Sequence, residues 1–177
     1  MIIAKRKHLL WGSLFLFACT HRSPQQRLAD YINDPKNKIT QEIKIGDIRV
    51  TAKWIPPIRN TKVAGNIKTL NPDQEDYSFF NVQFKKEVGE KPGNDKALYL
   101  DFDMQNDFTL YCEGDSIKPA ICQKIENGMS GNYEYILAFD KKLDRKDFSL
   151  FYKDKIFGIG VVAFVYDQND IRKIPGI

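Results

Sequence analysis

Hydrophobic and polar residues alternate along much of the chain from Ile43 onward. The clearest run is IRVTAKW at residues 48–54, where Ile, Val, Ala and Trp take every second position and polar side chains lie between them. Alternate side chains of a strand point to opposite faces, so this run predicts a strand with one buried face. Trp54 shares that face with apolar residues only, so we place it in the core. Pro56 and Pro57 end the strand.

Similar apolar runs follow, separated by Gly, Pro, Asn and Asp turns. They predict strands over residues 80–84, 98–104, 108–112, 117–125, 133–140, 148–152 and 156–166. Residues 58–76 fit neither period and are predicted to be a long connection. Seven or eight short strands with a turn every ~8–12 residues are typical of an antiparallel β-sandwich. We therefore predict one all-β domain over residues 43–177.

Three of these strands have distinctive positions. Pro119 cannot donate to a ladder, so 117–125 is predicted as an edge strand or a bulged one. The 133–140 strand is partly apolar on both faces, which suits a central position. Gly158 and Gly160 indicate a bend within the last strand.

The N-terminal segment has another pattern. The basic run Lys5-Arg6-Lys7 precedes a short apolar stretch that ends in Leu16-Phe17-Ala18-Cys19. The apolar stretch is about ten residues, too short for the ~20 that span a bilayer as a helix, and predicts a signal peptide over residues 1–18. An ordinary secretory signal or an uncleaved anchor are the alternatives.

Leu16, Ala18 and Cys19 match the motif of bacterial lipoprotein precursors, which this segment resembles. The resemblance implies cleavage before Cys19 and acylation of that residue, which gives lasting membrane attachment. No acidic run follows Cys19, so we expect the protein to face the periplasm from the outer membrane of a bacterial cell envelope. Residues 19–42 are predicted to hold the lipidated cysteine, a tether and a short helix.

That helix is predicted from its start and stop signals. Ser23 suits the N-cap, Pro24 the first helical position and Gln26 a capping box, while Asn33-Asp34-Pro35 ends the helix. We expect it to be a spacer folded against the domain rather than a docking helix at the membrane.

Charge excludes one class of partner. The first 18 residues hold three of the 27 Lys and Arg and none of the 23 Asp and Glu, so the rest carries 24 against 23, a net charge of +1. Nucleic-acid binding needs clustered positive charge, so we expect no nucleic-acid partner.

From Asp107 to Phe164 the order of strands and turns resembles the immunoglobulin-like, or telokin-like, domains of many exported bacterial lipoproteins. The resemblance covers about a third of the chain and implies an immunoglobulin-like sandwich that acts as an accessory or partner-binding module. It carries over no functional residues.

Cys112 and Cys122 remain once Cys19 is lipidated. An oxidising envelope compartment would allow them to form a disulfide. Two reduced thiols packed as small hydrophobic side chains are equally compatible with the sequence.

The residues available for catalysis are few. The only histidines are His8, in the signal, and His21, in the tether, so the predicted domain lacks histidine for a nucleophile system or a zinc site. Gly158-Ile159-Gly160 lacks the third glycine of a phosphate loop. We expect no enzyme activity and no cofactor.

The remaining candidates are carboxylates. In the predicted 98–104 strand, Asp101 and Asp103 share a face about 7 Å apart, a spacing compatible with an inverting glycosidase pair, although a solvated sheet face accounts for them better. Asp101, Asp103, Asn106 and Asp107 together offer oxygen ligands for a loop-type Ca²⁺ site.

These observations favour a non-catalytic envelope lipoprotein that binds another envelope protein, through the edge segment 117–125. The alternative is glycan binding through outward tyrosines, with Tyr99 as the principal contact and Tyr111 and Tyr166 as others. The closing run IGVVAF at residues 159–164 is also similar to small sandwich lipoproteins that help anchor contractile secretion machines.

Overall fold

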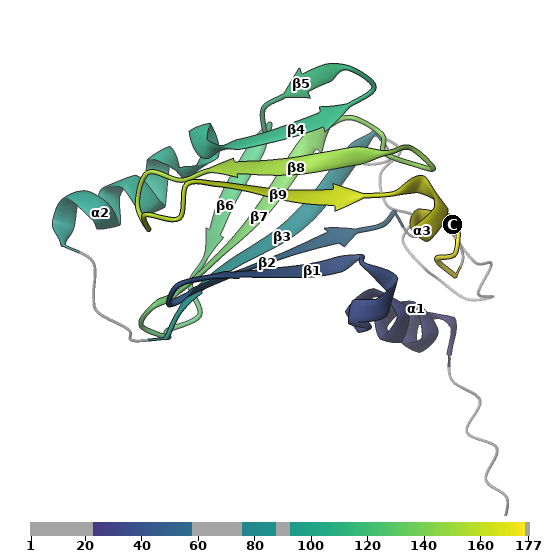
Figure 1. Cartoon of the computed structure of the whole chain (residues 1–177), viewed down its shortest axis with the longest axis horizontal. Coiled ribbons are helices and arrows are strands. Elements are labelled where there is room, and N and C mark those ends of the chain that lie inside the picture. The colour runs from purple at the N-terminus through teal and green to yellow at the C-terminus, as the bar shows by residue number, and fades with distance from the viewer. Residues whose placement is uncertain (1–22, 58–75, 88–92, 176–177) are drawn as a thin grey trace, which may run out of the picture.

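The computed structural model describes residues 23–57, 76–87 and 93–175, and these form two packed antiparallel sheets (Figure 1). The five-stranded sheet has the order β1 (Thr40–Ile45), β2 (Ile48–Ile55), β3 (Tyr77–Lys86), β7 (Asn132–Asp140), β6 (Ile121–Ile125). The four-stranded sheet has the order β5 (Asp115–Ile117), β4 (Phe108–Cys112), β8 (Phe148–Lys153), β9 (Val161–Tyr166). The predicted all-β antiparallel sandwich is confirmed, with nine strands in the described residues.

The core lies between the sheets and is rich in aromatic rings. Buried and partly exposed residues alternate along β2 and β3, as the sequence pattern predicts. Trp54 is fully buried and meets Phe148 edge-on, with 5.3 Å between ring centroids, while Phe148 stacks on Tyr166 at 4.8 Å. The placement of Trp54 in the core is confirmed, and Tyr166 is a core residue rather than an outward tyrosine.

Short helices close one end of the sandwich (Figure 1). They are α1 (Pro24–Asn33), η1 (Pro35–Asn37) and α3 (Gln168–Ile171). The capping box of Ser23 and Gln26 is present as predicted. Tyr31 donates a hydrogen bond to the Asp170 carbonyl at 3.3 Å, and Leu28 and Ile32 pack on the core, so α1 is folded against the domain.

The predicted strand 98–104 is wrong. The chain there is helical, as α2 (Asn94–Leu98), the π-helical turn η3 (Tyr99–Asp103) and the 3₁₀ turn η4 (Met104–Asp107). An alternating apolar pattern also contains i, i+4 pairs, which share one face of a helix. Leu100 and Met104 form the buried pair, whereas Leu98 and Phe102 point outward and are 58% and 70% exposed.

The predicted strand 48–54 is confirmed as β2, but β1 precedes it as an additional strand and pairs with it in a hairpin that turns at Gly46, where φ is 60°. Two other predicted strands differ in extent. The segment 117–125 divides between the edges of the two sheets, with Pro119 in the crossing from β5 to β6, so the predicted edge position is confirmed for β6. The last strand begins only at Val161, because residues 154–160 form a loop.

Several predictions concern residues outside the described ranges. The signal peptide, Cys19 and the histidines lie there, as does almost all of the predicted 58–76 connection. Within residues 23–57, 76–87 and 93–175, no helix is long and apolar enough to cross a membrane.

Candidate functional site

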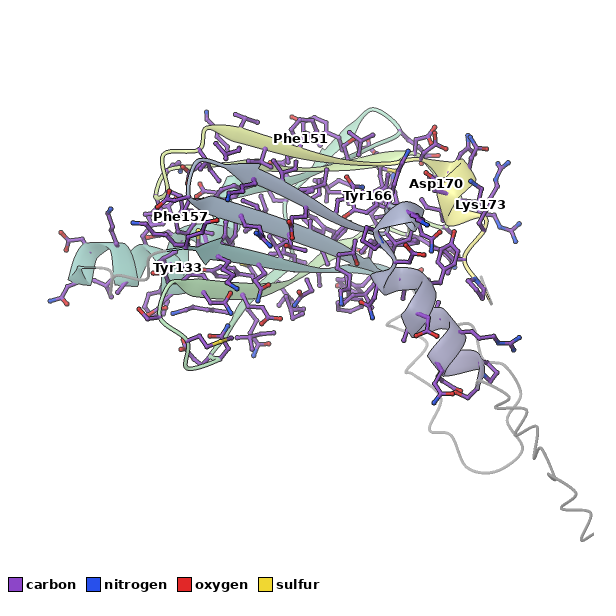
Figure 2. The ribbon with its side chains drawn as sticks, turned by 60° about the horizontal axis from the view of Figure 1, so that its bottom comes forward. Tyr133, Phe151, Phe157, Tyr166, Asp170 and Lys173 are labelled. Atoms are coloured by element: carbon purple, nitrogen blue, oxygen red, sulfur yellow. The ribbon has the colours of Figure 1, made fainter. Side chains whose placement is uncertain are left out.

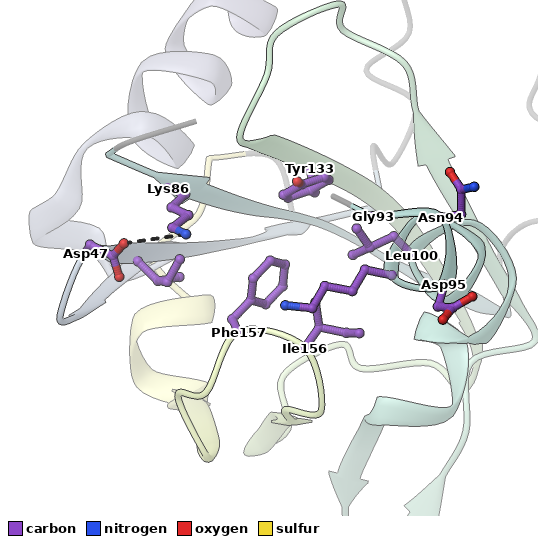
Figure 3. Close-up of a pocket in the computed structure, with 11 residues that line it drawn as sticks. Asp47, Lys86, Gly93, Asn94, Asp95, Leu100, Tyr133, Ile156 and Phe157 are labelled. Carbon is purple, nitrogen blue, oxygen red and sulfur yellow. Dashed lines mark ion pairs between the residues drawn. The ribbon is translucent and has the colours of Figure 1, made fainter. Parts of the chain in front are cut away.

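A pocket of about 690 Å³ opens at the end of the sandwich opposite α1 and α3 (Figure 3). Its apolar lining consists of Ile48, Leu100, Tyr133, Ile156 and Phe157. Its polar lining consists of Asp47, Lys86, Asn94, Asp95 and Lys96. The volume falls within the roughly 300–1,000 Å³ typical of small-molecule sites.

Five separate segments bring these residues together. They are the β1–β2 turn, the end of β3, the start of α2 and η3, the start of β7, and the 154–160 loop. Figure 2 shows Tyr133 and Phe157 at one end of the sandwich and Asp170 and Lys173 at the other. The pocket is therefore a product of the tertiary fold, and no single segment of the sequence contains it.

Asp154 organises the loop that carries Phe157. Its carboxylate accepts hydrogen bonds from the backbone amides of Ile156, Phe157 and Ile159 at 2.7–3.1 Å and from the Tyr152 hydroxyl at 2.8 Å. Burial by itself raises the pKa of this carboxyl, but the hydrogen bonds outweigh burial and hold the pKa below its ordinary value. The charged carboxylate thus holds the loop in one conformation.

Phe157 and Tyr133 form the aromatic wall of the pocket. Phe157 stacks on Phe84 of β3 with 5.0 Å between centroids and an interplanar angle of 20°. Tyr133 lies beside it, with 5.6 Å between centroids and a tilt of 41°. Burial raises the pKa of the Tyr133 hydroxyl, against the opposing charge of Lys124, so this hydroxyl stays protonated near neutral pH.

The polar rim carries charges of both signs. Asp47 and Lys86 form an ion pair at 4.0 Å on one side, shown as the dashed line in Figure 3. Asp95 and Lys96 lie on α2 at the other side. The four charges sum to zero.

The predicted glycan contact Tyr99 lies outside the pocket lining. Its hydroxyl donates to the buried carboxylate of Asp107 at 2.8 Å, and the Lys155 ammonium lies over its ring, 5.7 Å from the centroid. Lys155 also lies 3.1 Å from Asp107, and its hydrogen bonds to Asp107 and Tyr99 raise its pKa. Tyr99 and Asp107 therefore belong to a structural cluster with Lys155, which directly precedes Ile156 of the pocket lining.

The other predicted carboxylates are not arranged as the sequence suggests. Asp101 and Asp103 lie on the helical turn η3, so they do not share the face of a strand. Asp101 pairs with Lys124 at 2.6 Å, and the carbonyl of Asn106 accepts from Lys118 at 2.8 Å. In the part of the chain that the structure describes, no group of three His, Cys, Asp or Glu side chains is placed to hold a metal ion.

Cys112 and Cys122 are both free thiols in the structure. Cys112 lies in β4 of the four-stranded sheet, and Cys122 lies in β6 of the five-stranded sheet. Burial raises the pKa of Cys112, and it raises the pKa of Cys122 to about 11.

No protein family and no curated protein matches the sequence. Among solved structures, a novel protein of unknown function from Burkholderia pseudomallei aligns with a TM-score of 0.38 and 13% identity over 86% of this chain and 89% of that chain. A similarity of this degree assigns neither fold nor function.

Proposed function

We propose that this protein is a non-catalytic lipoprotein of a bacterial cell envelope, anchored through Cys19, whose sandwich binds another envelope protein. Near the N-terminus, a basic run, a short apolar stretch and a cysteine follow one another along the sequence, and this succession supports the anchor. The telokin-like resemblance supports a partner-binding domain. The edge and the outer face of the five-stranded sheet form the binding surface.

The main observation is an apolar row across the outer face of that sheet. The strand register places Ile55 beside Phe79, Phe79 beside Ala138, and Ala138 beside Ile121. Ala138 is itself buried, so the exposed members of the row are Ile55 and Ile121 at its two ends. The row ends at β6, an edge strand, where Ile121 is 53% exposed. A partner strand that pairs with β6 would extend the sheet and continue the row, so main-chain hydrogen bonds and apolar contact would act together.

Residues around β6 limit pairing between copies of the chain. Pro119 has no N–H to offer a second strand, and Lys118 and Lys124 place charges next to the edge. Lys118 is bound to the carbonyls of Asn106 and Phe108 at 2.8 and 3.1 Å. These features favour a specific partner over self-association.

The state of the thiols supports binding rather than catalysis. A thiol acts as a nucleophile only as thiolate, and burial raises the pKa of both Cys112 and Cys122. Lys124 pairs with Asp101, the carboxylate considered for glycoside hydrolysis, at 2.6 Å, and it also pairs with Glu126 at 3.0 Å.

The test is crosslinking in native membranes followed by capture of the protein. We expect a partner to be recovered with the wild type and lost with Ile121→Asp or Gln123→Lys, which place a charge on β6. Val161→Asp is the matched control for Ile121→Asp, because it places the same negative charge on the exposed face of β9, the edge of the other sheet. Recovery of no protein beyond that seen with the lipid anchor alone, or equal loss with Val161→Asp, would contradict the proposal. Recovery of a secretion-machine component would identify the accessory role.

A further inference from the structure

The pocket opposite α1 has an apolar wall, a charge-balanced rim and room for a small molecule. The Asp47–Lys86 pair and the Asp95 and Lys96 side chains contribute two charges of each sign. A site for a phosphate or another strong anion gathers positive charge and backbone amides, and a cation site gathers carboxylates. The balance at this rim suits a ligand without net charge.

The aromatic rings of the apolar wall are fixed in place by contacts with the core and with the 154–160 loop. Phe157 is supported by Phe84, on which it stacks, and its loop is fixed by the hydrogen bonds to Asp154. Tyr133 extends the wall from β7. A wall of this kind offers a preformed apolar face, so little ordering is required when a flat ligand is bound.

The rim supplies groups that a purely apolar ligand would leave unsatisfied. Asp47 and Lys86 are 4.0 Å apart, which is longer than a hydrogen bond, so their pairing leaves oxygen lone pairs and N–H groups available. Asn94 offers both a donor and an acceptor on the opposite side. An apolar ligand would desolvate these groups without compensation, whereas hydroxyl groups can donate to and accept from them.

We propose that this pocket binds a neutral saccharide. One pyranose ring lies with its C–H face against Tyr133 and Phe157, and its hydroxyl groups hydrogen-bond to Asn94 and to the Asp47–Lys86 side of the rim. The site is separate from the β6 edge and does not rest on the proposed protein-binding function. It also differs from a site at Tyr99, whose hydroxyl is already bonded to Asp107.

The test is calorimetric titration of the full-length protein, held in a detergent without a sugar headgroup. The probes are cellotriose, maltotriose and N-acetylated chitotriose. We expect at least one of them to bind, and Tyr133→Leu to weaken its binding by about tenfold or more. Binding of none of the three would overturn the proposal.

Two further variants separate the site from general effects on the fold. Tyr111→Leu is the matched control, because Tyr111 is an exposed tyrosine that contacts Phe151 on the outer face of the four-stranded sheet. It should leave the affinity unchanged. Asn94→Ala removes an exposed rim group at the start of α2 and should weaken binding even where Tyr133→Leu does not fold. The proposal is overturned if Tyr111→Leu weakens binding as much as Tyr133→Leu does. It is also overturned if the single variants Asn94→Ala and folded Tyr133→Leu both bind with wild-type affinity, because the sugar then lies elsewhere.

Discussion

The hydroxyl of Tyr152, at the inner face of β8, donates to the carboxylate of Asp154 at 2.8 Å. Because the same carboxylate binds three backbone amides of the 154–160 loop, the interior of the sandwich is linked directly to the loop that carries Phe157. The position of the pocket wall therefore depends on one charged side chain.

Asp154→Asn should destabilise the protein and loosen this loop. The amide retains only one of the two acceptor oxygens, and we expect a loss of roughly 1–2 kcal/mol in the free energy of unfolding at pH 7, since partial exposure lets water replace some of the lost bonds. Urea denaturation measures the loss. Asp103→Asn, on the exposed side of η3, is the control and should stay within about 0.5 kcal/mol of wild type. Equal unfolding energies for wild type and Asp154→Asn would contradict the role assigned to Asp154.

The same variant should alter the dependence of stability on pH. The pKa of Asp154 is lowered in the folded state, so its contribution is complete above the ordinary aspartate pKa of about 3.9 and is lost as the pH falls through the lower folded-state value. The gap in unfolding free energy between wild type and Asp154→Asn should be constant near neutral pH and shrink below about pH 4. Urea titrations at several pH values measure it, and a gap that widens in acid would show the opposite sign of shift.

Alanine substitutions distinguish the helical 94–107 segment from the strand predicted there. Leu100→Ala should cost about 2–5 kcal/mol, because Leu100 is buried on the inner face of the helix. Phe102→Ala should change stability by about 0.5 kcal/mol or less, because Phe102 is 70% exposed. Chemical denaturation compares the two. A strand with both residues on one buried face would make both substitutions costly.

Much of the sandwich follows from local patterns in the sequence. The alternation in IRVTAKW gives a strand because apolar side chains at a period of two share one sheet face, and Ser23 and Gln26 mark the helix start through hydrogen bonds within the first turn. The pattern from Leu98 to Met104 misleads because its apolar positions also satisfy the i, i+4 spacing of a helix. Burial of only Leu100 and Met104 is decided by packing against the core, which the sequence alone does not specify.

The pocket could not be predicted in the same way. Its wall combines Tyr133 and Phe157, which are 24 positions apart, with Phe84 behind them from another strand. The Lys153-Asp154-Lys155 sequence does indicate a turn, but the reach of the Asp154 carboxylate to Ile159 is a tertiary feature. The sequence indicates Tyr99 and Asp107 as candidate functional residues. In the structure they are hydrogen-bonded to each other, and Asp107 is paired with Lys155, so their role is structural.

Alkylation should report two thiols. Without reductant, denatured protein from the native envelope should gain two alkyl groups per chain at Cys112 and Cys122, since neither is bonded in the structure. Native protein should label slowly at neutral pH because burial raises both pKa values. Intact mass spectrometry counts the added groups. Labelling of denatured protein only after reduction would demonstrate a disulfide.

The mature protein should begin at Cys19 and carry lipid. Intact mass of protein extracted from membranes should match residues 19–177 with acyl chains on Cys19, and Cys19→Ser should abolish the modification and membrane retention. Any other N-terminus, or an unmodified cysteine, would rule out the lipoprotein assignment.

The position of α1 has a consequence for orientation. Four residue steps separate Cys19 from Ser23, the N-cap of α1, and an extended chain covers at most about 14 Å over that distance. With Cys19 acylated, the end of the domain that carries α1 is held next to the lipid headgroups. The end that carries α2 and the pocket is then the one farther from the membrane (Figure 1). The pocket would then take its ligands from the aqueous space away from the bilayer surface. A longer tether between Cys19 and Ser23 would allow the domain to rotate, so that the pocket could also face the membrane.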